Sequence, residues 1–294
     1  MILVTGATGS IGRYLVRRLQ QEQAPFKALV RDETKGRTLG CDFVVGDLDD
    51  ADSIAAALKG VDRLFLNAAG AQPVSGEQPM IRQQKTAIDA ARAAGVSEIV
   101  KISVWHAHEG GRLAEGAHWQ IEQHLKASTP NWSLLQPSGF MQNFITGAGA
   151  FTDDGKLVGA YGDSAVSYID CHDIAACAAV LLTGSPGTGE SYVLTGPEAL
   201  TQAQIAEKLS AATGRTVDYV SLSPDQLAAA LKAQGLPPQF ADDVAVLSEE
   251  VASGSLATTT SAVLDLTGRA PRTFDEFLAD NREALRSGPV PSDG

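Results

Sequence analysis

The chain has 294 residues, of which 44% are hydrophobic and 20% charged, so it is long enough for one or two globular domains with a sizeable core. Its net charge of −12 argues against nucleic-acid or anionic membrane partners, and no apolar run reaches the roughly 20 residues of a membrane span. Because there is no signal-peptide pattern and the three cysteines form no close pair, we expect a cytoplasmic protein without disulfides.

The first hundred residues alternate between short apolar runs and stretches with helical periodicity. Residues 1–5 are apolar and β-branched, a glycine-rich loop follows, and the apolar residues after it recur at helical spacing. This alternation predicts parallel strands joined by crossover helices that cover both faces of one sheet. Further strands are expected at 26–30, 42–45, 63–66 and 98–102, and helices at 49–58 and 80–94.

The second half of the chain is less regular. Residues 104–116 carry histidines and glycines without periodicity, as an active-site loop does, and a helix at 117–127 and a strand at 133–136 follow. The carboxy-terminal third is expected to be mostly helical, because three capping boxes mark helix starts. These boxes begin at Thr201, Ser223 and Thr273.

These patterns divide the chain into three parts. We expect an α/β domain over residues 1–150 and a mixed region over 151–286 that completes the sheet and forms a second lobe. The Gly/Pro/Ser-rich tail over 287–294 is expected to be disordered, because it has too few apolar residues to pack against the core.

The loop between the first strand and the first helix has the chemistry of a phosphate site. Glycines let the backbone approach a pyrophosphate, and the unpaired amides and positive dipole end of the helix favour that charge. A glycine-rich turn without a ligand is the alternative, but the strand–loop–helix context at the start of the chain favours dinucleotide binding. The predicted contacts are Gly6, Thr8, Gly9, Ser10, Ile11 and Gly12.

The loop Thr5-Gly6-Ala7-Thr8-Gly9-Ser10-Ile11-Gly12 resembles the GxxGxxG loop of extended and atypical short-chain dehydrogenases/reductases, and later segments resemble their NmrA-like branch. The resemblance spans the chain to about Ala284 and implies an NADP(H)-binding Rossmann domain. That branch contains reductases, including quinone reductases, and redox-sensing regulators that bind NADP without turnover. The later segments are Ala28-Leu29-Val30-Arg31, Gly46-Asp47-Leu48, 90–96, 99–103, 134–144 and 168–175.

Arg31, at the end of the second strand, favours NADP(H) over NAD(H). An NAD enzyme usually places a carboxylate there for the ribose hydroxyls, whereas an NADP enzyme needs a cation for the 2′-phosphate. The planar guanidinium of Arg31 suits a phosphate, and Arg13 or Lys35 is a candidate second cation. Asp32 keeps the NAD alternative open.

Asp47 and Leu48 follow the third strand, where the resemblance places the adenine. The carboxylate would accept from the exocyclic amine and the leucine would pack on the ring, although Asp47 is equally suited to cap a helix. Residues at the ends of later strands are predicted to contact the same cofactor. They are Asn67, Ala68, Ala69, Ser103 and Pro137.

The Tyr-x-x-x-Lys pair of standard short-chain dehydrogenases is absent, because none of the five tyrosines has a lysine four positions later. His118 and Glu122 stand where the resemblance places that pair. Ser103 is a candidate donor to the acceptor oxygen, and His118 a candidate proton donor whose ring Glu122 would orient. The alternative is a surface helix with a hydrogen-bonded His/Glu pair. The spacing of His106, His108, His118 and Glu122 fits no common zinc pattern, so no metal is expected.

Hydride transfer needs a positioned nicotinamide and an electrophilic acceptor, and a quinone needs less acid assistance than a ketone. We therefore predict an NADP(H)-dependent oxidoreductase, monomeric or homodimeric, that acts on a quinone or polycyclic aromatic ketone. Two alternatives stay open: an NADP-sensing regulator that binds a protein partner, and an enzyme that oxygenates an aromatic polyketide-like substrate. The predicted substrate residues, which would line a flat apolar cavity, are Trp105, His106, Trp119, Phe140, Met141 and Asn143.

Overall fold

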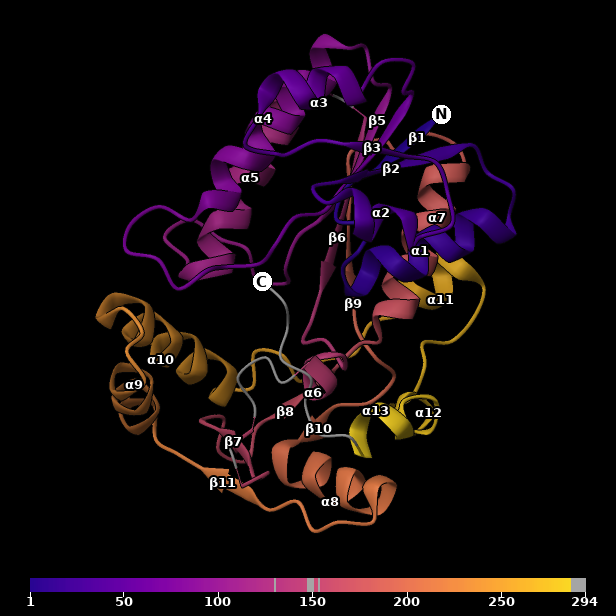
Figure 1. The fold of residues 1–294 in the computed structure, drawn as a ribbon. Coiled ribbons are helices and arrows are strands. Elements are labelled where there is room, and N and C mark those ends of the chain that lie inside the picture. Colours follow the sequence, from indigo (N-terminus) through magenta and orange to yellow (C-terminus); the bar gives the residue numbers. More distant parts are fainter. Residues whose placement is uncertain (130, 147–150, 153, 287–294) are drawn as a thin grey trace.

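The computed structural model describes residues 1–129, 131–146, 151–152 and 154–286, and in this part of the chain seven parallel strands form the central sheet (Figure 1). The strand order is β3-β2-β1-β4-β5-β6-β9, so the order reverses between β1 and β4. The Rossmann-type α/β fold expected from the sequence is confirmed. The strands are β1 (Ile2–Val4), β2 (Phe26–Val30), β3 (Phe43–Val45), β4 (Arg63–Leu66), β5 (Glu98–Ile102), β6 (Trp132–Pro137) and β9 (Glu190–Leu194).

Helices cover both faces of this sheet, and the strand residues alternate between the two cores. Val4 and Ile102 belong to the core beneath α1 and α7, whereas Leu3 and Ile99 belong to the core beneath α4 and α5. Helix α2 lies along β2 and β3 at one edge. The helices of the first face are α1 (Ser10–Gln21), α7 (Cys171–Thr183) and α11 (Ala262–Thr267); those of the second are α3 (Ala51–Ala57), α4 (Pro79–Ala93) and α5 (Leu113–Ser128); α2 is Glu33–Arg37.

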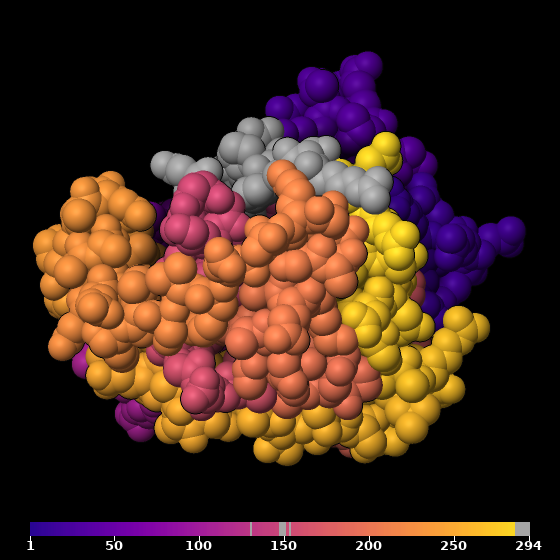
Figure 2. All heavy atoms as spheres, turned by 90° about the horizontal axis from the view of Figure 1, so that it is seen from below, coloured from indigo at the N-terminus to yellow at the C-terminus, as the bar shows by residue number. Residues whose placement is uncertain are grey.

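A second lobe has its own core, in which Phe144 meets Tyr168 and Phe274 edge-on. Its helices, coloured orange to yellow, form most of the face seen in Figure 2. The three predicted capping boxes are confirmed at the starts of α8, α9 and α12. The elements are α6 (Asn143–Thr146), β7 (Leu157–Gly159), β8 (Ala165–Val166), β10 (Leu200–Thr201), α8 (Gln202–Thr213), β11 (Tyr219–Ser221), α9 (Pro224–Ala233), α10 (Pro238–Ala252), α12 (Phe274–Asp280) and α13 (Arg282–Arg286), with β8 paired to β10 and β7 to β11.

Helix α5 begins four residues earlier than its sequence predicts, at Leu113 instead of residue 117. Gly116 made this segment resemble a loop, since glycine is a poor helix former. In the structure a Cβ on Gly116 would lie 2.1 Å from the Gly111 carbonyl oxygen, so the glycine serves close packing of the preceding loop against the first helical turn. The irregular segment is therefore shorter than expected, and its end is helical.

The carboxyl ends of the strands point toward the second lobe (Figure 1). Two contacts join the lobe to the segment after β5: His106 Nε2 donates to the Ser255 carbonyl oxygen at 2.9 Å, and Arg112 pairs with Asp243 of α10 at 3.5 Å. No helix within the described ranges is long and apolar enough to cross a membrane. The tail predicted to be disordered, 287–294, lies outside the described residues.

Candidate functional site

The glycine loop after β1 packs closely against its neighbours in the fold. Gly6 has φ +63°, and a Cβ there would lie 2.9 Å from the Asn67 carbonyl oxygen. A Cβ on Gly12 would lie 2.1 Å from the Gly6 carbonyl oxygen, so only glycine lets α1 start this close to the loop. Helix α1 is capped by Gly9 without a side-chain bond and has no acid in its first turn, which leaves its amino-terminal amides for an anion.

The other predicted loop residues surround this cradle. Thr8 is half-buried, Ser10 is exposed at the start of α1, and Ile11 is buried under it. Thr5 Oγ1 donates to the Asn67 carbonyl oxygen at 2.7 Å and accepts from the Asn67 amide at 2.8 Å. The ends of β1 and β4 are thereby tied together at the point where the strand order reverses, which is where open α/β sheets bind ligands.

Asp32 and Arg31, the two residues at the end of β2 that could recognise the ribose of a cofactor, have different surroundings. The Asp32 carboxylate caps α2, accepting from the amides of Thr34 at 2.7 Å and Lys35 at 3.2 Å. Arg31 is exposed beside it, and Arg13 Nε donates to the Thr8 carbonyl oxygen at 2.7 Å, which places a second guanidinium against the glycine loop. The carboxylate thus caps α2, whereas the two guanidinium groups of Arg31 and Arg13 stand at the carboxyl edge of the sheet.

Asp47 does not cap α3, so that alternative interpretation is wrong. The cap is Asp50, which accepts from the amides of Asp52 and Ser53. Asp47 instead accepts from the Asp49 amide at 3.0 Å, and Leu48 packs against the core beneath α3 and α4.

The other residues predicted to contact the cofactor lie at the ends of two further strands. Ala68 and Ala69 follow Asn67 after β4, and Pro137 ends β6. All lie at the carboxyl edge of the sheet, where the sequence places the cofactor.

A buried polar network joins the end of β5 to α5. Ser103 is 1% exposed and its Oγ donates to Glu122 Oε1 at 2.6 Å. The same carboxylate accepts from Gln136 Nε2 at 2.9 Å and from Lys126 Nζ at 3.2 Å, with Lys126 reaching the surface. The prediction that Glu122 orients the His118 ring is therefore wrong, because its oxygens bind these three side chains instead.

His118 is bound by a residue that sequence reasoning missed, Lys101 of β5. Lys101 Nζ lies 2.8 Å from His118 Nδ1 and donates to the Ile102 carbonyl oxygen at 2.9 Å. Burial lowers the pKa of Lys101 to about 7, with Glu122 opposing this and Lys126 adding to it. Burial and the Lys101 charge hold the pKa of His118 well below its usual value. The signal that could have found it is a lysine between the apolar residues Val100 and Ile102, two residues before Ser103 and so on the same face of the strand.

The residues predicted to bind substrate are only partly brought together. Trp105 and His106 stack, with ring centroids 4.6 Å apart, and His106 has φ +63°, which is rare outside glycine. Trp119 on α5, Phe140 and Asn143 are half-buried. Met141 is 1% exposed and packs in the core of the second lobe, so it does not line a substrate cavity.

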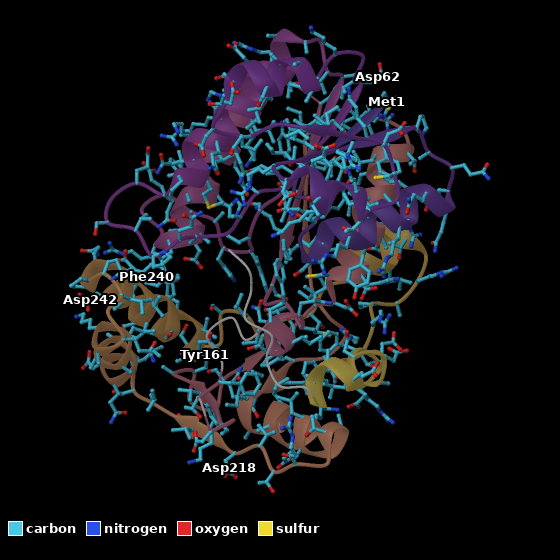
Figure 3. The ribbon with its side chains drawn as sticks, viewed as in Figure 1. Met1, Asp62, Tyr161, Asp218, Phe240 and Asp242 are labelled. Carbon is cyan, nitrogen blue, oxygen red and sulfur yellow. The ribbon has the colours of Figure 1, made fainter. Side chains whose placement is uncertain are left out.

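A surface cleft of about 500 Å³ lies at the other edge of the sheet. It is lined by residues that include Met1, Asp62 and Arg63, and Figure 3 shows Met1 and Asp62 together at that edge. The glycine loop and the buried network lie at the carboxyl ends of the strands, so this cleft is no part of the candidate site. No group of three His, Cys, Asp or Glu residues that could hold a metal occurs among the described residues.

The match to a known family extends over both lobes. Residues 1–278 match the NmrA-like family. The chain belongs to this family. The NAD(P)H azoreductase of Xenophilus azovorans is 38% identical over 290 residues, covering 97% of this chain and 99% of the azoreductase. Quinone oxidoreductase 2 of Escherichia coli is 31% identical over 284 residues, covering 95% and 98%.

A solved structure of a similar protein shows the same architecture. The NADPH complex of an NADPH-dependent quinone oxidoreductase from Escherichia coli has a TM-score of 0.81 at 30% identity, and the superposition covers 95% of this chain and 99% of that one. The second lobe is therefore part of the architecture that the chain shares with this quinone oxidoreductase.

Proposed function

We propose that the chain uses NADPH to reduce a flat aromatic acceptor, a quinone in the first place. The chain is an NAD(P)H-dependent oxidoreductase of the NmrA-like family, and its relatives over nearly full length include a quinone oxidoreductase and an azoreductase. The choice of a quinone as acceptor is based on the buried polar network at the end of β5. It replaces the usual tyrosine and lysine, and it leaves little acid assistance for a poorly electrophilic ketone.

The cofactor would be held by the loop from Gly6 to Gly12 and by the start of α1. The glycine at position 12 lets the start of α1 lie against the loop, and the uncapped amides of α1 would donate to a pyrophosphate bound there. Arg31 and Arg13 would bind the 2′-phosphate, which favours NADP(H) over NAD(H). When bound, the reduced cofactor supplies the hydride, and the chain has to supply orientation and a proton.

Acid assistance in this site is limited by the hydrogen bonds already made. The Ser103 hydroxyl donates to Glu122, so it is not free to donate to an acceptor oxygen while that bond lasts. His118 Nε2 has no hydrogen-bond partner among the described residues, and it is therefore the donor of the network that an acceptor can use. One weak donor suits a quinone or an azo bond, whose first reduction product is a stabilised anion.

The substrate would lie beside Ser103, between the sheet and the second lobe. The stacked Trp105 and His106 side chains, with Trp119 of α5, offer flat surfaces for an aromatic ring. The bond from His106 to Ser255 holds this aromatic segment against the lobe. Substrate contact is therefore assigned to Trp105, His106, Trp119, Phe140 and Asn143, whereas Met141 packs in the core of the second lobe.

The direct test is anaerobic NADPH oxidation against quinones, azo dyes and simple aliphatic ketones, with product identification. We expect quinols as products, a slower reaction with azo dyes, and no turnover of the aliphatic ketones. NADPH oxidation that needs oxygen and inserts it into the aromatic substrate would contradict this proposal in favour of oxygenation. Tight NADPH binding without turnover of any acceptor would contradict it in favour of a sensor.

We expect Arg31→Ala to weaken NADPH binding about tenfold and to leave NADH binding within about twofold, because only NADPH carries the 2′-phosphate. The loss is that of an exposed charge-assisted contact, which water partly replaces. Fluorescence titration of both cofactors measures it. Arg17→Ala removes an exposed arginine from α1 and is the matched control for lost positive charge. An unchanged preference of Arg31→Ala for NADPH over NADH would show that another group binds the 2′-phosphate.

A further inference from the structure

The central feature is a lysine buried in the middle of the sheet. Lys101 is 0% exposed, and its neighbours in register on β4 and β6 are Leu66 and Leu134. An ammonium in such surroundings is costly unless it is bound by other polar groups. The structure supplies two partners, the Ile102 carbonyl oxygen and His118 Nδ1.

The hydrogen bond to His118 fixes the tautomer of the ring. An ammonium has donors only, so Nδ1 of His118 must accept when Lys101 is charged, and the neutral ring then carries its proton on Nε2. The charged groups that act on Lys101 are Glu122 and Lys126, both of α5. All buried residues of the neighbouring helix α4 are uncharged. Lys101 and His118 are thus a directly hydrogen-bonded pair, with Glu122 and Lys126 as the charged groups that act on the lysine.

We propose that Lys101 is a positioning residue that orients His118 and replaces the proton which His118 delivers to the reduced acceptor. The inference rests on the proposed function, because it needs an acceptor that takes up both a hydride and a proton. His118 touches the acceptor through Nε2, and Lys101 acts only through Nδ1 of the same ring.

The proton balance of this relay is complete. As hydride reaches the acceptor, the Nε2–H bond of His118 breaks and its proton forms the new O–H or N–H bond of the product. The ammonium of Lys101 gives its proton to Nδ1 in the same step, so the imidazole stays neutral and Lys101 becomes a neutral amine. After product release, Nε2 takes up a proton from the solvent and the Nδ1 proton returns to Lys101, so each turnover consumes one solvent proton. The low pKa of Lys101 makes its neutral form accessible near neutral pH.

Two acceptors separate proton delivery from hydride transfer. A quinone needs a proton after the hydride, whereas the N-methylphenazinium cation is converted to its neutral reduced form by hydride alone. We expect Lys101→Met and Lys101→Gln to lower kcat for the quinone about 10- to 100-fold. With N-methylphenazinium, kcat should stay within about threefold of the parent. Glutamine can donate a hydrogen bond to Nδ1 but cannot give up a proton, so it tests proton supply apart from orientation.

Folding and cofactor binding are checked by circular dichroism and NADPH titration, which should match the parent. A parent-like quinone rate in Lys101→Gln would overturn the proposal, and so would equal losses with both acceptors. The pH profile gives a further readout: the rise in quinone kcat as the pH falls through about 7 should disappear in both variants.

A nitrogen NMR titration, which needs no turnover, tests the Lys101–His118 pair independently of the proposed function. If the parent reduces neither acceptor, the proposed function is wrong, and nitrogen NMR of the parent decides whether the pair exists. We expect the Lys101 amine to titrate near neutral pH and the His118 Nδ1 resonance to shift with it, both in the absence of acceptor. Titration of Lys101 near the value of an exposed lysine would overturn the proposal.

Discussion

Gly12→Ala is expected to weaken NADPH binding by at least about 100-fold. The added Cβ would lie 2.1 Å from the Gly6 carbonyl oxygen and 2.7 Å from Ala7 Cα, both of them backbone atoms that cannot rotate away. The helix must therefore move away from the loop, which removes one or two of the amide contacts to a charged pyrophosphate. Overpacking of this kind also costs about 1–3 kcal/mol of stability, more than the roughly 1 kcal/mol that alanine gains over glycine in a helix.

Gly70→Ala is the matched control for this substitution. Gly70 lies in the segment after β4, and a Cβ there would meet nothing within 4 Å. We expect its NADPH affinity and melting temperature to equal those of the parent. Calorimetric titration with NADPH, together with thermal unfolding of each variant, separates lost binding from lost folding. If Gly12→Ala folds and binds NADPH like the parent, the glycine cradle is not the pyrophosphate site.

The sheet was predictable because its pattern is local. Strands β2, β4 and β5 have the bounds expected from their apolar runs, and the capping boxes at Thr201, Ser223 and Thr273 were visible as residue types three apart. The start of α5 could not be predicted from the sequence, because Gly116 has a packing role that depends on Gly111, and a contact of that kind has no signature in helical periodicity.

The hydrogen-bond partners of the site side chains were less predictable from the sequence than the places of these residues in the fold. The sequence placed Ser103, His118 and Glu122 near one another, and the structure does bring them to one edge of the sheet. It pairs them differently, because β5 presents Lys101 and Ser103 on the same face toward α5, and Lys101 is long enough to reach His118. One turn of separation between His118 and Glu122 was compatible with a direct bond, so spacing alone could not exclude it.

The network at the end of β5 also has a consequence for stability, since Lys101 binds its proton more weakly when the chain is folded. Its pKa is about 7 in the folded chain, against 10.5 for an ordinary lysine. Between these values the unfolded chain holds more protons, so Lys101 makes the free energy of unfolding rise with pH. Below about pH 7 the full cost of burying the ammonium applies, on the order of 4–5 kcal/mol.

Lys101→Met is therefore expected to stabilise the chain most at low pH, by an amount that shrinks as the pH rises. The difference in unfolding free energy between variant and parent should fall by about 1.4 kcal/mol for each pH unit between about pH 8 and 9.5, where the folded parent has lost the Lys101 proton and the unfolded parent still holds it. Urea unfolding of both proteins across this range measures the difference, and Lys59→Met, at an exposed lysine, controls for the loss of a lysine side chain. A difference that stays constant with pH would mean that Lys101 keeps an ordinary lysine pKa in the folded chain, and a lysine that holds its proton so firmly could not resupply His118.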